Sequence, residues 1–525
     1  MPPKLKKALL LGLAALLLAV GGQGEWMLNR EREVLGISRF TDLKGAPPML
    51  ALTTVALGGF RGLISNLLWM RATDLQDEGK YFEMVQLADW ITKLEPHFPH
   101  VWLVQSWNMA YNISVKFKDY PDRWRWVQRG IELLRDDGLR YNPHDVLIHR
   151  ELAWFFQHKM GADMDDAHIY YKLHWAIDMN EVFGTNRPAG GTGLPRPDWE
   201  QLIHPSTTNW QYRAYVLTNR FKLDPVLMKQ IDDKYGPLEW RLPEAHAIYW
   251  ALLGLDQAAK NERKIDPEDL IKLRRVVYQS MQTTFQRGRL IAVNPTRKAF
   301  EFGPNIDIIP HVNDAYNQAK IDDPKNRDHI ETAQRNFLRD AVFYLYMYNQ
   351  IKDAEAWFKF LCKEYPDKTL LYRRPESLPG KVELYDYVIG RLEEEVGSTG
   401  RNMAEMILEG LEATAMRSLA VGEQDRYLGY DGMAERFWER YMSKIPEGQA
   451  AERIKLDPLP EIRRIVLDRL VDNQVLPAEA TGQLLQALRI APRRVVNTNT
   501  PPAGLDTNNP PATTTTTPPA AKPAK

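Results

Sequence analysis

The residues with the clearest potential for chemistry form an acidic cluster in the first third of the chain. The cluster consists of Asp163, Asp165, Asp166 and His168. Carboxylates beside an imidazole can bind a metal ion or act as a general acid and base. The same residue types also favour the first turn of a helix, where free backbone amides and the helix dipole stabilise them. We favour this helix-start interpretation, because no histidine pair here has the i, i+4 spacing of two ligands on one helical face.

A second set of polar residues lies in the segment 184–310, which departs from the helical pattern on both sides. It contains Asp198, Glu200, His204 and His246. These residue types serve hydrolases and carbohydrate-active enzymes as acids and bases. Such a site requires the groups to converge in one cleft with perturbed pKa values. An envelope hydrolase or carbohydrate-active enzyme is therefore the alternative hypothesis for function.

Other potentially chemical motifs have simpler interpretations. The glycine-rich segment 189–193 lacks the lysine of a phosphate-binding loop and precedes Pro195 and Pro197, so it predicts an exposed loop. The single cysteine, Cys362, lies in an apolar segment and predicts core packing, because a free thiol behaves as a small apolar group. We therefore predict no catalytic residue, no metal ligand and no cofactor.

A tryptophan-rich stretch permits two interpretations, a ligand platform or buried core. Its tryptophans are Trp102, Trp107, Trp124 and Trp126. Because helical repeats bury large aromatic residues between layers, we predict core packing for all four. The arginines around them alternate with acidic residues, which predicts a solvated face rather than a nucleic-acid-binding stripe.

Composition limits the class of protein. Apolar residues make up 44% of the 525 residues, enough for a large core, and one cysteine excludes an intramolecular disulfide. The 68 basic residues balance the 68 acidic residues. Without a net field there is no general attraction to nucleic acid, so we expect no nucleic-acid partner.

Most of the chain has the three- and four-residue apolar spacing of amphipathic helices joined by short loops. The segment 335–368 matches the 34-residue tetratricopeptide (TPR) pattern well, and 65–98 matches it more loosely. A third, irregular pair combines 152–156 with 167–175. The residues expected to pack between repeat helices, or to end them, are Leu68, Ala72, Leu75, Trp102, Ala153, Phe156, Leu338, Ala341, Leu345, Ala354, Phe358 and Pro366.

These positions make the chain similar to TPR proteins, and its N-terminus makes it resemble membrane-anchored TPR proteins of bacteria. The resemblance implies stacked antiparallel helix pairs and carries no activity with it. At the N-terminus, three lysines precede the apolar run 8–20. The run is shorter than the roughly 20 residues of a full membrane span. A signal anchor and a cleaved signal peptide are both open, and we favour the anchor.

The predicted fold class is all-α, a signal-anchor helix followed by a TPR-like α-solenoid, with a short β-hairpin-like insertion near 290–310. The predicted N-terminal parts are an anchor or signal peptide (1–24), a linker (25–48) and TPR-like repeats (49–182). An irregular middle region (183–310) and a further TPR-like repeat (311–368) follow. The chain ends in a C-terminal helical region (369–490) and a disordered tail rich in Pro, Thr and Ala (491–525).

Concave helical-repeat surfaces bind segments of other proteins. We therefore expect a scaffold without enzymatic activity, attached to the bacterial inner membrane by its N-terminal helix, with the bulk of the chain in the periplasm. Its partners would be other proteins in envelope or secretion-related assembly.

Overall fold

The computed structural model describes residues 61–489 and a few residues between 12 and 31. Within 61–489 it leaves out 185–193, 261–264, 295–298, 373, 397–400, 446–454 and 473–474. The predictions for the anchor, the linker, the glycine-rich loop and the C-terminal tail therefore lie largely or wholly outside the described residues. Among the residues described, no helix combines the length and the apolar character needed to cross a bilayer.

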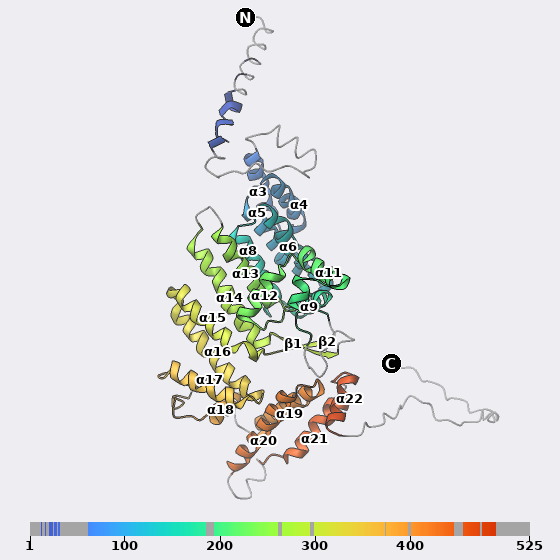
Figure 1. Cartoon of the computed structure of the whole chain (residues 1–525), viewed down its shortest axis with the longest axis vertical. Helices are drawn as coiled ribbons and strands as arrows, with labels where there is room; N and C mark the ends of the chain where they lie inside the picture. Colours follow the sequence, from blue (N-terminus) through green and yellow to red (C-terminus); the bar gives the residue numbers. More distant parts are fainter. Residues whose placement is uncertain are drawn as a thin grey trace, which may run out of the picture.

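Helices dominate the described chain and follow one another along an elongated molecule (Figure 1). The all-helical character expected from the sequence is confirmed at this level. The N-terminal third contains α3 (Arg61–Asp77), α4 (Tyr81–Leu94), α5 (Pro99–Trp107), α6 (Tyr120–Glu132), α7 (Leu139–Tyr141) and α8 (Val146–Trp154). Several of these continue into π-helical turns, namely η2 (Asn108–Ile113) after α5, η4 (Leu133–Gly138) after α6 and η5 (Phe155–Met160) after α8; η3 (Ser114–Lys116) is a 3₁₀ turn.

The row of successive helices is interrupted in the middle of the chain by a group of helices, called here the excursion. Helix α8 packs mainly along α13, whereas α9 packs against the π-helical turn η5. The irregular pair predicted between 152–156 and 167–175 stays a prediction: α9 packs on η5, where Phe156 meets Trp175 (ring centroids 5.0 Å apart), but α8 itself packs along α13. The excursion comprises α9 (His168–Phe183), α10 (Trp199–Ile203), α11 (Thr208–Tyr215), η6 (Val216–Arg220) and α12 (Pro225–Tyr235), and the row resumes with α13 (Pro243–Ala259) and α14 (Pro267–Arg287).

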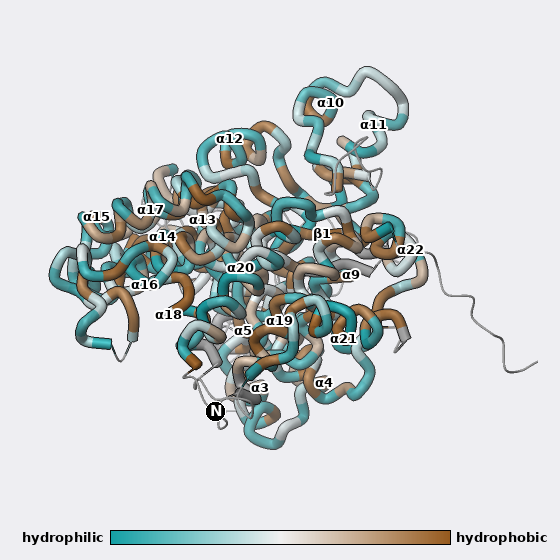
Figure 2. The backbone as a smooth tube through the Cα atoms, turned by 90° about the horizontal axis from the view of Figure 1, so that it is seen from below, coloured by the Kyte–Doolittle hydropathy of each residue, from teal (hydrophilic) through white to brown (hydrophobic). Residues whose placement is uncertain are grey.

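Figure 2 shows α10 and α11 standing apart at the edge of the molecule, and α11 has no buried residue.

After α14 the chain forms an antiparallel hairpin of β1 (Arg289–Asn294) and β2 (Ala299–Gly303), in which Leu290 pairs with Phe302. The hairpin predicted near 290–310 is confirmed. The remaining elements are η7 (Ile306–Ile308), α15 (Ile309–Asp322), η8 (Pro324–Asn326), α16 (Arg327–Met347), α17 (Ile351–Glu364), α18 (Leu384–Val396), α19 (Arg401–Ala420), α20 (Gln424–Ser443), α21 (Leu459–Asp472) and α22 (Ala478–Ala487).

Three helix pairs, α3/α4, α16/α17 and α19/α20, are joined by the same turn. Each turn has one residue in the left-handed region: Gly79 (φ 70°), Asn349 (φ 59°) and Gly422 (φ 82°). The amide of the next residue then donates to a carbonyl five positions earlier: Lys80 to Leu75 (2.8 Å), Gln350 to Leu345 (2.9 Å) and Glu423 to Ser418 (2.8 Å). This is the hydrogen bond of a Schellman helix end, which reverses the chain tightly.

Several helices end in one backbone conformation at the residue before a proline. At Glu95, Asn142, Asp323 and Tyr365, φ lies between −132° and −127° and ψ between 59° and 68°. The ring of the following proline disfavours helical geometry at the preceding residue, so the helix ends there. The sequence predicts three of these ends from Pro96, Pro143 and Pro366.

One large core runs through most of the described chain. Of the predicted packing residues, Ala72, Leu75, Trp102, Ala153, Phe156, Leu338, Ala341, Leu345 and Ala354 are at most 4% exposed. Leu68 and Phe358 are half-buried and Pro366 is exposed. Phe358 meets the ring of Tyr387 on α18 (centroids 5.3 Å apart) and keeps part of its surface in solvent. Pro366 lies beyond the helix that it ends.

Candidate functional site

Four aromatic side chains form a stacked row, the aromatic ladder, across two neighbouring elements. Trp107 at the end of α5 stacks on Tyr111 of η2, with ring centroids 4.0 Å apart and planes 15° apart. Trp154 at the end of α8 stacks on His158 of η5, with centroids 4.5 Å apart and planes 9° apart. The Tyr111 hydroxyl and His158 Nδ1, 3.2 Å apart, join the two stacks. Trp107 is 41% exposed, and the other three are half-buried.

Local structure explains why these rings align. Each stack pairs residues four apart in sequence, which lie on one face of a helix. Each stack also spans the change from α- to π-helix, a local irregularity that is frequent at functional sites. Helix α6 lies close behind the junction of α5 and η2: a Cβ on Gly130 would meet the Ser106 carbonyl oxygen of α5 at 2.9 Å and the Ala110 Cβ of η2 at 3.3 Å. Glycine at position 130 therefore permits this close approach.

A charged pocket opens beside the ladder. Its cavity of about 440 Å³ lies within the usual range for a ligand-binding cleft. The lining combines residues of η2, η3, α6, η5 and the segment before α9: Tyr111, Val115, Arg123, His158, Lys159, Met164, Asp165 and Asp166. Met164 is 78% exposed and Val115 is 50% exposed, so the rim of the pocket is apolar.

Asp165 organises the charges of the pocket. Its carboxylate lies 2.6 Å from Lys159 Nζ and 2.6 Å from Arg123 Nη2, and it accepts a hydrogen bond from the Ala167 amide (2.9 Å). Burial opposes ionisation, but these donors hold the pKa of Asp165 below its usual value. Burial lowers the pKa of Lys159, and Asp165 partly offsets this effect. The ammonium group of Lys159 also lies 4.9 Å from the Tyr111 ring centroid.

Two residues of the predicted acidic cluster, Asp165 and Asp166, thus line this pocket. Asp165 binds a backbone amide just before α9, in agreement with the helix-start interpretation, but its contacts with Lys159 and Arg123 were not predicted. Asp163 is exposed, and His168 Nδ1 lies 3.0 Å from Lys172 Nζ. Within the part of the chain that the structure describes, no group of three or more His, Cys, Asp or Glu residues is placed to hold a metal ion.

Glu151 of α8 contributes a second carboxyl near the ladder. Its charge acts on Tyr111, and burial raises the pKa of that phenol. Burial also raises the pKa of Glu151 itself to about 7. Among the described residues nothing hydrogen-bonds to its buried Oε1 atom. The ladder therefore borders a carboxyl group that is partly protonated near neutral pH.

The four polar residues predicted for a hydrolase have separate structural contacts. Asp198 caps α10 by accepting a hydrogen bond from the Gln201 amide (3.1 Å). Glu200 and His204 are exposed. His246 is fully buried; its Nε2 lies 2.8 Å from the Trp240 carbonyl, and burial lowers its pKa to about 4.

The tryptophan prediction is partly wrong. Trp102 and Trp124 are buried, at 4% and 7% exposure, as predicted for core residues. Trp107 is instead exposed on the ladder, and Trp126 is half-buried. Trp102 and Trp107 lie on α5, and Trp124 and Trp126 lie on α6, so each helix carries one buried and one more accessible tryptophan. Cys362 is half-buried against the core, and burial raises the pKa of its thiol.

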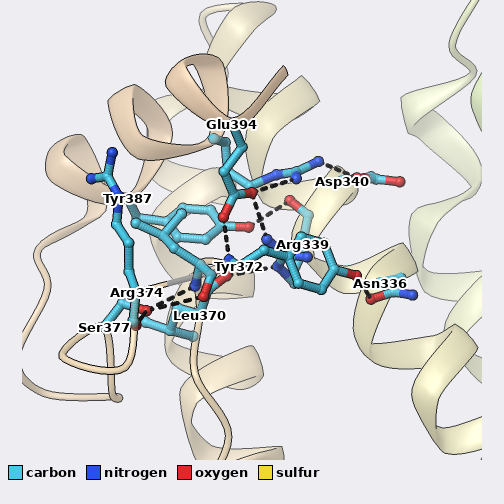
Figure 3. Close-up of polar contacts among 11 residues, drawn as sticks. Asn336, Arg339, Asp340, Leu370, Tyr372, Arg374, Ser377, Tyr387 and Glu394 are labelled. Carbon is cyan, nitrogen blue, oxygen red and sulfur yellow. Dashed lines mark hydrogen bonds and ion pairs between the residues drawn. The ribbon is translucent and has the colours of Figure 1, made fainter. Parts of the chain in front are cut away.

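Another polar cluster joins α16 to α18 and has a structural role (Figure 3). Arg339, which is buried, donates to Glu394 (2.9 Å), and Arg391 bridges Glu394 (3.0 Å) and Asp340 (2.7 Å). The Tyr387 hydroxyl donates to the Arg339 carbonyl (2.9 Å). Each charge in this set has an opposite charge beside it, which makes it a packing contact between helices rather than a ligand site.

Comparison with known proteins gives no relative: no family model, curated protein or solved structure matches the chain. Arguments about function therefore depend on the geometry of this chain alone.

Proposed function

We propose that this protein is a TPR-like helical scaffold that binds a segment of a partner protein along the aromatic ladder. The shared Schellman turns and pre-proline helix ends support a repeated helix-pair unit. The observation that carries the proposal is the ladder itself, which crosses from α5–η2 to α8–η5 and keeps its rings accessible. Surfaces between neighbouring helix pairs are the usual binding surfaces of helical repeats.

The chemistry of the ladder matches protein recognition. Tryptophan, tyrosine, methionine and arginine are enriched at protein interfaces, and the first two dominate binding hot spots. The ladder and pocket contain all four types, in Trp107, Tyr111, Met164 and Arg123. Because Arg123 is held by Asp165 (2.6 Å) and Asp166 (2.7 Å), the polar part of the surface is preorganised. Preorganisation reduces the entropy lost on binding.

The charges favour a partner segment with a basic side chain. Arg123 and Lys159 are already paired within the pocket, and the Asp166 side chain remains 68% exposed. Asp163 is exposed next to it. A guanidinium or ammonium group also gains from contact with the face of a tryptophan or tyrosine. We therefore propose a segment that places arginine or lysine on the ladder, flanked by apolar residues that contact Met164 and Val115.

We further propose that the N-terminal segment attaches the scaffold to the bacterial inner membrane, with the helical row in the periplasm. The described residues of this segment are helical, and they expose Leu16 (61%), Val20 (62%), Trp26 (64%) and Met27 (67%). Apolar side chains at this exposure gain from burial in lipid. Figure 1 shows the described helical residues between 12 and 31 beyond α3, at the end of the molecule opposite α19 and α20.

Site-specific photo-crosslinking tests the scaffold proposal. A photoreactive phenylalanine analogue at position 107, in cells of the source organism, is expected to capture one partner at a segment containing arginine or lysine. Trp154→Ala in the same chain should reduce the crosslink several-fold, because it removes the second stack. A photoreactive residue at Tyr215, which is 63% exposed on α11, is the matched control. Equal capture from both positions, or capture unaffected by Trp154→Ala, would contradict the proposal.

A further inference from the structure

A second cavity lies at the opposite part of the molecule, where the β-hairpin meets the C-terminal helices. It also measures about 440 Å³. Two of the shared helix turns border it, through Tyr348 and Gln350 of the α16/α17 turn and through 422–426 of the α19/α20 turn. Arg289 at the start of β1 and the segment 194–197 close the other sides. Figure 1 shows the hairpin directly beside the α19/α20 pair.

Most of the charges that line this cavity neutralise one another. Arg289 contacts Glu423 (2.8 Å), and Arg241 contacts Glu239 (2.8 Å). At the rim, Arg196 and Asp307 are 3.8 Å apart and largely exposed. The two remaining charged residues of the lining are Arg426 and the exposed Asp425. Among the charged residues of this lining, only the Arg426 guanidinium and the Asp425 carboxylate therefore remain to contact a charged ligand.

Two polar groups of the lining have no hydrogen-bond partner among the described residues. The Tyr348 hydroxyl is one of them, although the residue is only 3% exposed. The other is Arg426 Nε; the guanidinium lies 5.8 Å from the ring centroids of both Tyr348 and Tyr430. A buried polar group without a partner is unfavourable, and a bound ligand would supply the missing partner. Burial raises the pKa of Tyr348 to about 12, which keeps its hydroxyl a hydrogen-bond donor at neutral pH.

Two helices begin at the same cavity without a side-chain cap. The residues before α17 and α20, Gln350 and Glu423, both line the cavity, and neither caps its helix through its side chain. The first amides of a helix lack intrahelical partners and carry the positive end of the helix dipole. Uncapped helix starts therefore favour an anion.

We propose that this cavity binds a small molecule through an oxyanion, a carboxylate or a phosphate group. Arg426 supplies the positive charge, the Tyr348 hydroxyl donates a hydrogen bond, and the starts of α17 and α20 contribute the positive ends of their helix dipoles. The Arg289–Glu423 pair sets the wall against which the ligand packs. This site is separate from the aromatic ladder, and it does not depend on the proposed scaffold function.

Isothermal titration calorimetry on the purified full-length chain tests the site, with inorganic phosphate and succinate as separate probes. We expect saturable binding of at least one probe. The probe that binds identifies the group as phosphate or carboxylate. Tyr348→Phe removes only the hydroxyl, so it should weaken binding about tenfold or more, as expected for a hydrogen bond to a charged group. The thermal melt of the free protein should not fall, because the hydroxyl has no partner to lose. Arg426→Gln should weaken binding by at least as much.

The matched controls are Tyr427→Phe on α20 and Arg464→Gln on α21, neither of which lines the cavity. Both should leave binding of the probe unchanged. The proposal is overturned if neither probe binds, or if the Tyr348→Phe and Arg426→Gln variants bind the probe as tightly as the unaltered chain.

Discussion

Asp165 and Glu151 both act on Tyr111 of the aromatic ladder, yet their surroundings shift their pKa values in opposite directions. Burial opposes the charge of each. Lys159, Arg123 and the Ala167 amide outweigh burial at Asp165 and lower its pKa, whereas Arg150 offsets it only partly at Glu151. The ladder thus lies between a fixed negative charge and a carboxyl whose charge depends on pH.

This contrast predicts a pH-dependent effect of Glu151→Gln. The pKa of Glu151 in the folded chain is about 7, above the 4.5 of an unperturbed glutamate. The protonated carboxyl therefore contributes stability that is complete below pH 4.5 and is lost as the pH rises through 7. Glutamine never ionises, so the variant should be more stable than the unaltered chain at pH 8, by about 3 kcal/mol, and equally stable at pH 4.5.

Thermal melts at the two pH values measure this effect. Glu200→Gln is the control, because Glu200 is exposed, and its melting temperature should stay close to that of the unaltered chain at both pH values. A Glu151→Gln variant that melts at the same temperature as the unaltered chain at pH 8 would contradict the burial of this carboxyl.

Sequence alone could predict only the local part of these sites. The interpretation of Asp165 as a helix-start residue depends on neighbours in sequence, and the Ala167 amide confirms it. Its ionic partners come from α6 and η5, and no spacing rule connects them. The exposure of Trp107 was also beyond prediction, because it depends on how α5 packs against α4 and α8.

At the level of elements, one turn is used three times with different residues in the left-handed position. Gly79 and Gly422 adopt positive φ without steric cost, and Asn349 is the side-chain-bearing residue that tolerates it best. The α3/α4 and α16/α17 pairs were predictable, because Pro96 and Pro366 end them. The α19/α20 pair was not recognised as a repeat; Pro446 follows α20 three residues after its end, one position later than Pro366 follows α17.

Gly79→Ala tests the turn. No atom lies within 4 Å of the added methyl group, so any loss of stability comes from the backbone conformation (φ 70°). We expect a loss of about 1 kcal/mol, with most of it restored in Gly79→Asn. Chemical denaturation provides the measurement. Gly410→Ala within α19, where the added methyl group also meets nothing, should instead stabilise the chain, because alanine favours a helix interior over glycine. A Gly79→Ala variant of unchanged stability would argue against the left-handed turn.

Ala354→Asp tests the packing of α16 against α17. Ala354 is fully buried at the start of α17, opposite the apolar residues Leu338, Ala341 and Leu345 of α16. A carboxylate there has no partner, and the variant should lose about 3 kcal/mol or more. Asp353→Ala, one residue earlier on an exposed position, is the control and should have little effect. If Ala354→Asp melts like the unaltered chain, the residue is not packed as described.

At the scale of the whole molecule, the row of helices is interrupted by α9 to α12; the irregular middle region predicted from 183 includes α10 to α12, but the sequence does not reveal that the interruption begins with α9. Helix α8 and helix α13 pack along each other although α9 to α12 lie between them in the chain. Periodicity identifies each of these helices but carries no information on which pairs are in contact. Between 152 and 182 the local spacing therefore indicates the contact of α9 with η5, but it gives no sign of the long-range contact of α8 with α13.

The last prediction concerns attachment to the membrane. The buried apolar residues of the described chain begin at Ala72, and the main core extends from Trp102 to Leu484. A chain starting at Arg61 therefore retains these contacts and should show the helical circular dichroism and melting transition of the full chain. If the first 24 residues anchor the protein, the full chain should sediment with membranes and resist carbonate extraction, whereas the shortened chain should remain in the supernatant. A full chain found in the soluble fraction would exclude the anchor, and an unfolded shortened chain would show that the N-terminal segment contributes to the core.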